Sequence, residues 1–139
     1  MLNNIFLSKQ HLEIRRAIRE LEEDIQVEQE VIKNALWIAL KIGTLSGILL
    51  VHLKYEDEFL YPELINSVDP EIKKVSSWFN DDMGTLAQEF QAYQKKFLQD
   101  PGAIRSNATE FIKETGVILG AINKRVEAEE NLLYPLLAK

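Results

Sequence analysis

Two residues four apart in the stretch HLKYEDEFLYPEL, residues 52 to 64, have the chemistry to hold a metal ion together. His52 and Glu56 share one face of a helix, so an imidazole nitrogen and a carboxylate oxygen can reach the same ion. This spacing alone is a weak signal, because such pairs are common on helix surfaces. The stretch RVEAEENLLYPLL, residues 125 to 137, repeats the phrase with Arg125 and Glu129 in the corresponding positions.

Polar residues also fall on faces that are otherwise apolar. His11, Arg125 and Glu129 have Leu, Ile or Phe neighbours three or four residues away, as do His52 and Glu56. Buried imidazoles and carboxylates are destabilising unless they are paired or coordinated. Helical bundles often satisfy such groups with a metal site built from inward-facing Glu and His. The pattern therefore predicts a metal site.

Helices must position these residues. Apolar side chains recur at spacings of three and four over about residues 3 to 26, 33 to 66, 70 to 99 and from 107 to the end. On this periodicity, Phe59, Leu132 and Leu136 belong to the apolar stripes. Asp69 followed by Pro70 is a favourable start for the third helix. We predict an all-α fold, an antiparallel up-down-up-down four-helix bundle, with residues 1–139 forming one domain.

Counting residues from each reversal places the polar side chains at one depth. The pair on the second helix and the pair on the fourth both lie level with a short stretch of the third helix that contains Phe79, Asp82 and Met83. His11 reaches this layer if the first reversal is centred near residue 31. The predicted metal ligands are His11, His52, Glu56, Glu129, Asp82 and Glu130.

Composition excludes several classes of function. The chain has no cysteine, which excludes disulfides, thiolate zinc sites and iron–sulfur clusters. Its net charge of −6 argues against a nucleic-acid or anionic-membrane partner. The apolar segment 35–51 contains Lys41, and we interpret it as a buried helix rather than a membrane span. We expect a cytoplasmic protein, because its first residues do not resemble a signal peptide.

The arrangement of these motifs resembles the bacterial hemerythrin-like HHE cation-binding family. The resemblance is carried by QH on the first helix, the two repeated phrases, and FNDDMGTLAQEFQAY on the third helix, and it covers nearly the whole chain. It implies a four-helix bundle. In members with all ligands, it implies a non-heme di-iron centre that binds oxygen reversibly or senses oxygen, nitric oxide or iron.

The chain departs from that family's ligand pattern in two helices. The third helix has no histidine, although Asp82, Met83 and Gly84 resemble the phrase of a sub-group, and Arg125 replaces the fourth-helix histidine. With only two histidines in the chain, the full histidine set of an oxygen carrier is excluded. Tyr61 and Tyr134 precede prolines at helix ends, and we interpret them as packing anchors.

Three states of the site remain open. The first is a carboxylate-rich site for iron, manganese or zinc, with one or two ions. In the second, no metal is bound, and the guanidinium of Arg125 is forked to Glu56 and Glu129. In the third, His11, His52 and Glu56 hold a single ion with an open coordination position. In the first and third states, Arg125 can also bind the outer oxygen of a ligating carboxylate.

The leading functional hypothesis is a non-heme iron-binding domain that binds or senses iron or a diatomic ligand, oxygen or nitric oxide, rather than catalysing a reaction. The alternative is a metal-free bundle with a structural or signalling role towards a protein partner that the sequence does not identify. A ferritin-type oxidase is less favoured, because it needs more carboxylates in one layer. Nucleophilic catalysis has no supporting motif.

Overall fold

Helices make up nearly all of the described part of the chain. The structure, a computed structural model, describes residues 4–138. The four long helices are α1 (Asn4–Asp24), α3 (Ala35–Tyr55), α5 (Pro70–Phe97) and α7 (Ala108–Ala128). Shorter helices are α2 (Glu28–Lys33), α4 (Tyr61–Ile65) and α6 (Pro101–Ser106). Two π-helical turns, Glu56–Leu60 and Glu129–Leu133, continue α3 and α7, and a 3₁₀ segment, Tyr134–Ala138, follows the second.

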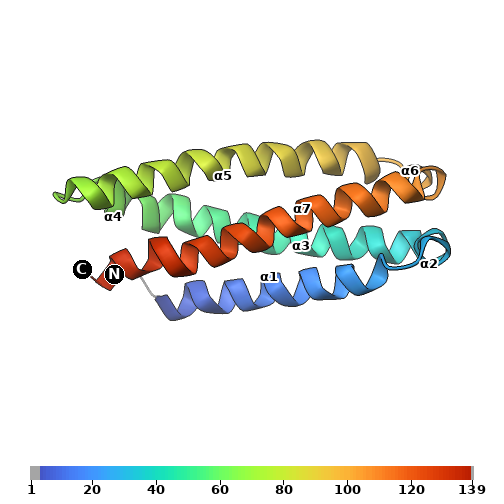
Figure 1. The fold of residues 1–139 in the computed structure, drawn as a ribbon, viewed down its shortest axis with the longest axis horizontal. Coiled ribbons are helices and arrows are strands. Elements are labelled where there is room, and N and C mark those ends of the chain that lie inside the picture. The colour runs from blue at the N-terminus through green and yellow to red at the C-terminus, as the bar shows by residue number, and fades with distance from the viewer. Residues whose placement is uncertain (1–3, 139) are drawn as a thin grey trace.

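The long helices form an antiparallel bundle. α1 packs against α3 and α7, and α5 packs against α4 and α7. Figure 1 shows the four long helices running along one axis, with both chain ends at one end of the bundle and α2 and α6 together at the other. The predicted all-α bundle is confirmed. The first reversal, which carried no Gly or Pro signal, consists of the short helix α2.

The start of α5 follows the expected chemistry. Asp69 accepts a hydrogen bond from the backbone N–H of Glu71 through Oδ1 at 2.9 Å, and Pro70 occupies the first turn. This satisfies one of the free N–H groups at the helix N-terminus, and the proline needs no N–H there. The helix boundary next to the second reversal is therefore encoded locally.

The core consists of two apolar clusters with a polar layer between them. The larger cluster extends from Ile14, Leu49, Leu86 and Ile122 towards the end of the bundle that contains α2 and α6. The smaller cluster lies near the chain ends and contains Leu7, Leu60, Tyr61, Leu64, Ile72, Phe79, Leu133 and Tyr134. The buried ionisable side chains of α1, α3, α7 and the two π-helical turns lie where these two sets meet: His11, His52, Glu56, Arg125 and Glu129.

The π-helical turns shift the buried register by one residue. Phe59 and Leu132 are 54% and 60% exposed, whereas the next residues, Leu60 and Leu133, are fully buried. The prediction that Phe59 and Leu132 line the core is therefore wrong. Each turn is followed by a proline two residues on. Proline lacks an N–H and its ring clashes with the carbonyl four residues earlier, so regular α-helical bonding cannot continue there.

The helix that contains α3 is unusually apolar on both faces. By length and composition alone, the segment Ala35–Ile65 could cross a membrane. In the bundle, one face carries the buried residues Ile38, Ile42 and Leu45, while Trp37 and Leu40 on the other face are exposed. The packed face explains why this helix is apolar where it meets its neighbours. The expected absence of a membrane partner stays a prediction.

The shifted register predicts unequal effects for two neighbouring leucines. Leu133→Ala should destabilise the protein by about 2–5 kcal/mol, because it leaves a cavity in a closed core. Leu132→Ala should change stability by less than about 1 kcal/mol, since that side chain is 60% exposed. Urea unfolding of the two variants measures the difference. If a regular α-helix continued after Glu129, Leu132 would be the buried residue and Leu132→Ala would be the more destabilising substitution.

Candidate metal centre

Three buried side chains from three helices bring their donor atoms together. His11 Nε2 lies 3.1 Å from His52 Nε2 and 2.9 Å from Glu129 Oε1. The third distance, from His52 Nε2 to Glu129 Oε1, is 3.3 Å. All three side chains are buried, and their arrangement is one that could hold a metal ion. The sequence predicted each of these residues, and the structure places them together.

The outer nitrogens of both histidines face hydrogen-bond acceptors. His11 Nδ1 lies 2.9 Å from Glu130 Oε2, and His52 Nδ1 lies 2.7 Å from the amide oxygen of Gln10. An ionised carboxylate and an amide oxygen only accept hydrogen bonds, so these contacts favour the tautomer with the proton on Nδ1. In that tautomer the lone pair of each Nε2 is directed towards the other ring. This arrangement is typical of metal-binding histidines.

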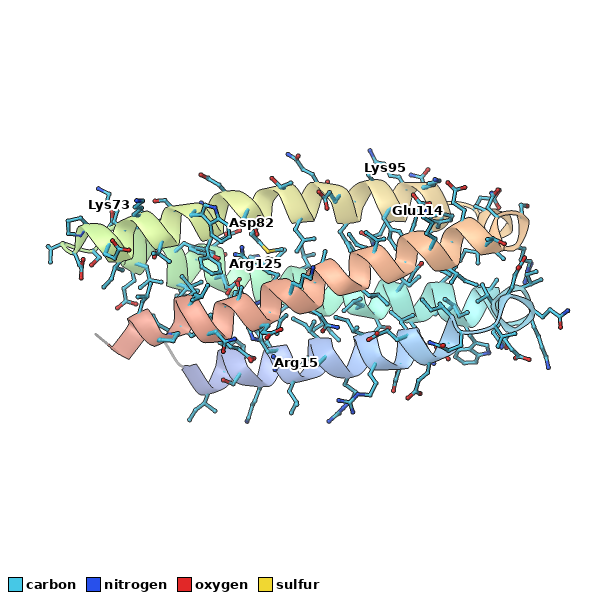
Figure 2. The ribbon with its side chains drawn as sticks, in the orientation of Figure 1. Arg15, Lys73, Asp82, Lys95, Glu114 and Arg125 are labelled. Carbon is cyan, nitrogen blue, oxygen red and sulfur yellow. The ribbon has the colours of Figure 1, made fainter. Side chains whose placement is uncertain are left out.

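Glu130 is itself held in place from α1. Arg15 donates two hydrogen bonds to its carboxylate, at 2.7 and 2.9 Å. Figure 2 shows Arg15 on α1, on the side that faces α7. Arg15 and His11 therefore share one carboxylate, and this contact fixes the orientation of the His11 ring. Glu130 supports the donor group from outside and does not enter it.

No positively charged Lys or Arg side chain lies at the point where these donor atoms meet, among the residues that the structure describes. Two imidazole nitrogens and a carboxylate oxygen meet, and the buried Oε1 of Glu56 lies 3.4 Å from His52 Nε2 and accepts no hydrogen bond from a neighbouring donor. Bonds of about 2.1 Å from one ion place neighbouring ligands about 3.0–3.4 Å apart. The observed separations of 2.9 to 3.4 Å match this range. The residues present therefore fit a metal ion.

The two core carboxyl groups differ in their pKa. Burial and the nearby Glu129 charge raise the pKa of Glu56 well above its usual range. Burial also acts to raise the pKa of Glu129, but hydrogen bonds donated by His11 and His52, with the proton on Nε2, and by Glu56 outweigh it in the metal-free protein, and the net pKa is strongly lowered. Without a metal ion, Glu129 is the ionised member and Glu56 is held protonated. Such a difference between the pKa values of two neighbouring carboxyl groups is common at functional sites.

The π-helical turns bring two tyrosines into the polar layer. In each turn the N–H five residues on bonds to the glutamate carbonyl, Tyr61 to Glu56 and Tyr134 to Glu129. Residues five apart in a π-helix lie closer to one face than in an α-helix. Tyr134 donates to Glu56 Oε2 at 3.0 Å, and its oxygen lies 2.9 Å from His11 Nε2. Both tyrosines pack in the smaller apolar cluster, as predicted, and their hydroxyl groups in addition reach the polar layer.

Burial and the charges of Glu129 and Glu56 raise the pKa of Tyr134 far above its ordinary value. Without a metal ion, its side chain is therefore a neutral phenol that can donate the hydrogen bond to Glu56. Burial likewise raises the pKa of Tyr61, which is also neutral.

Arg125 lies on the far side of Glu129 from the histidines. Its Nε lies 3.4 Å from Glu129 Oε2, one terminal nitrogen donates to Tyr61 at 2.6 Å, and the other to Asp82 at 3.1 Å. The guanidinium also packs over the ring of Phe79, 4.8 Å from its centroid. Figure 2 shows Arg125 and Asp82 lying between α7 and α5. The predicted fork to Glu56 is absent, since Arg125 bonds to these other partners.

The predicted ligands thus separate into two groups. The structure brings His11, His52, Glu56 and Glu129 together, whereas Asp82 pairs with Arg125 and Glu130 with the outer nitrogen of His11. Gln10 and the tyrosine hydroxyls were not predicted to contact the site. Gln10 directly precedes His11 in the sequence, and the tyrosines are shared by both repeated phrases, which are the signals that could have pointed to them.

A family comparison agrees with this geometry. The family model for the hemerythrin HHE cation-binding domain matches residues 5–137. The chain belongs to the hemerythrin family. Comparison with curated proteins and with solved structures finds no significant match. Membership in a cation-binding family and a buried group of donors without a central charge both indicate metal binding.

The raised pKa of Glu56 predicts a pH dependence of stability in metal-free protein. Glu56 is protonated in the folded state but ionises above about pH 4.3 in the unfolded chain. The folded state then binds more protons, so the free energy of unfolding falls as pH rises from that value towards the raised pKa. The slope contributed by one group is at most about 1.4 kcal/mol per pH unit.

Glu56→Gln should remove this contribution. Urea unfolding with a chelator present, from about pH 5 to pH 8, measures the slopes. Glu58→Gln, in the same phrase but exposed, is the matched control and should keep the wild-type slope. Equal slopes in the wild type and in Glu56→Gln would contradict the assignment.

Proposed function

We propose that this hemerythrin-family domain binds one iron ion through His11, His52, Glu56 and Glu129 and acts in binding or sensing rather than catalysis. The observation that carries the proposal is the meeting, inside the core, of two histidine Nε2 atoms with carboxylate oxygens of Glu129 and Glu56. Burying these acceptors without a cation is unfavourable. A metal ion removes that cost.

The chemistry of the donors supports iron. Imidazole nitrogen suits iron, zinc and copper, while carboxylate oxygen suits harder ions. A set with two of each fits iron, with manganese and zinc as the alternatives that metal analysis distinguishes. The outward hydrogen bonds of both histidines orient the rings for coordination, as outer-shell partners do in metal sites.

The position of Arg125 supports a single ion. Glu129 directs Oε1 to the histidines and Oε2 to the guanidinium, so its two oxygens face two different cation positions. A second metal ion bound to Oε2 would lie beside a permanent positive charge in a poorly solvated core. Repulsion between like charges at such short distances is large. Arg125 therefore takes the place that a second ion would occupy in a dinuclear centre.

An apolar cavity supports a diatomic ligand, oxygen or nitric oxide. A cavity of about 140 Å³ reaches His52, Glu129 and Arg125 at the polar layer, and its other walls are mostly aliphatic. Among the wall residues are Leu49, Leu86, Ala87, Ile122 and Val126. Small apolar molecules partition into such a cavity more readily than water does. The cavity thus offers a route to the proposed ion from between α3, α5 and α7.

A metal-free bundle with a structural or signalling role is the alternative. In that case Arg125 would have to neutralise the buried carboxylates. Its hydrogen bonds go to Glu129, Asp82 and Tyr61 and not to Glu56, so they support this alternative less well. Metal content separates the two functions directly.

Metal analysis of protein purified without a histidine tag tests the proposal. We expect about one iron per chain after iron-replete growth, and a loss of most of it in His52→Ala, because one ligand and one oriented nitrogen are removed. Glu58→Gln is the control and should retain wild-type iron, since Glu58 is exposed. Wild-type protein without metal under these conditions would overturn the proposal and favour the alternative.

Filling the cavity should slow ligand binding without emptying the metal site. Ala87→Phe places a large ring in the cavity and should reduce the association rate of nitric oxide with the ferrous protein by about tenfold or more, since the route is narrowed. Gln88→Phe, on the exposed face of the same helix, is the control. Stopped-flow spectroscopy measures the rates. Unchanged rates in Ala87→Phe would exclude this cavity as the route.

A further inference from the structure

We propose that the phenol oxygen of Tyr134 is a direct ligand of the ion, so that the centre is a mononuclear metal–tyrosinate site. This inference rests on the proposed function, because it assigns a further ligand to the same ion. The histidine and carboxylate ligands of the site do not require a tyrosine ligand. The inference is drawn from the position of the Tyr134 hydroxyl.

The Tyr134 oxygen lies among the inner donor atoms rather than beside them. It is 2.9 Å from His11 Nε2 and 3.3 Å from Glu129 Oε1. Neighbouring ligands around one ion with bonds of about 2.1 Å have these separations. Its ring also stacks on the His11 ring at 5.1 Å between centroids, which limits its freedom to turn away. An ion in contact with both His11 Nε2 and Glu129 Oε1 therefore also meets the phenol oxygen.

The repeated phrase offers an internal comparison. Tyr61 and Tyr134 occupy the same position in the two phrases, both follow a π-helical turn, and both are buried. Tyr61 accepts a hydrogen bond of 2.6 Å from the Arg125 guanidinium, whereas Tyr134 faces the histidines. Each tyrosine oxygen thus faces one of the two cation positions that share Glu129. One position holds Arg125, and the other is the proposed ion site.

The binding step balances without an added reactant. The O–H bonds of Tyr134 and of the protonated Glu56 carboxyl group break, the electron pairs stay on the oxygens for bonding to the ion, and the two protons are released to water. The negative charges of the phenolate and of Glu56 and Glu129 together equal the charge of a ferric ion. Tyrosinate is an established ligand for ferric iron in haem proteins. The set therefore favours the ferric state over the ferrous state.

Ferric phenolate complexes absorb visible light through charge transfer from the phenolate to the metal, which gives a readout independent of activity. The protein is loaded with ferrous iron without oxygen and then oxidised with ferricyanide, and excess reagent is removed. We expect a visible absorption band in the wild type. Tyr134→Phe should lose the band while retaining about one iron per chain, since the other ligands remain.

Tyr61→Phe is the matched control. It removes the equivalent hydroxyl from the other phrase and should keep the band. A resonance Raman spectrum of the wild type provides a measurement that does not depend on the folding of any variant. Excitation into the band should enhance phenolate ring modes, and these should shift when the protein is made with ring-deuterated tyrosine.

The outcomes separate the two proposals. Iron-loaded wild type without a visible band, or Tyr134→Phe with the band intact, would overturn tyrosinate ligation and leave the iron site in place. A band lost in Tyr61→Phe and kept in Tyr134→Phe would assign the ligand to the other tyrosine. Wild type that binds no metal would overturn both the ligation and the proposed function.

Discussion

The structure depends on one electrostatic constraint, which is the burial of several acceptor atoms around a point that lacks a positive charge. Both histidines have their protons turned outwards, to Glu130 and Gln10, and Glu129 is ionised. Apolar clusters flank this layer along the bundle. A cation among these groups would lower the cost of burying them, so the stability of the bundle and the chemistry of the site are linked.

The repeated phrases show how one pattern serves two different cations. Each supplies an inward glutamate, a π-helical turn and a tyrosine that reaches back to the polar layer. The change from His52 in one phrase to Arg125 in the other removes a ligand and adds a fixed charge. Glu129 lies between the two positions. The bundle thus carries imidazole donors on one side of Glu129 and a fixed positive charge on the other.

Much of this arrangement was predictable from hydrophobic periodicity. The four long helices, the depth of the polar layer and the meeting of His11, His52, Glu56 and Glu129 follow from spacing and from counting residues between reversals. The π-helical turns were not predictable in this way, because one extra residue per turn is a local response to the following proline. Their register change moved Phe59 and Leu132 outwards and the tyrosine hydroxyls inwards. Spacing also could not tell on which side of Glu129 the guanidinium lies.

The contacts of Arg125 have a consequence for communication between the interior and the surface. The guanidinium touches the buried oxygen of Glu129 on one side and Asp82, whose side chain is 49% exposed, on the other. A unit change of charge among the donors alters the field at Glu129 and then the strength of the Arg125–Asp82 pair. A partner that contacts this face of α5 would therefore meet a surface ion pair that is linked through Arg125 to the buried carboxylate of Glu129.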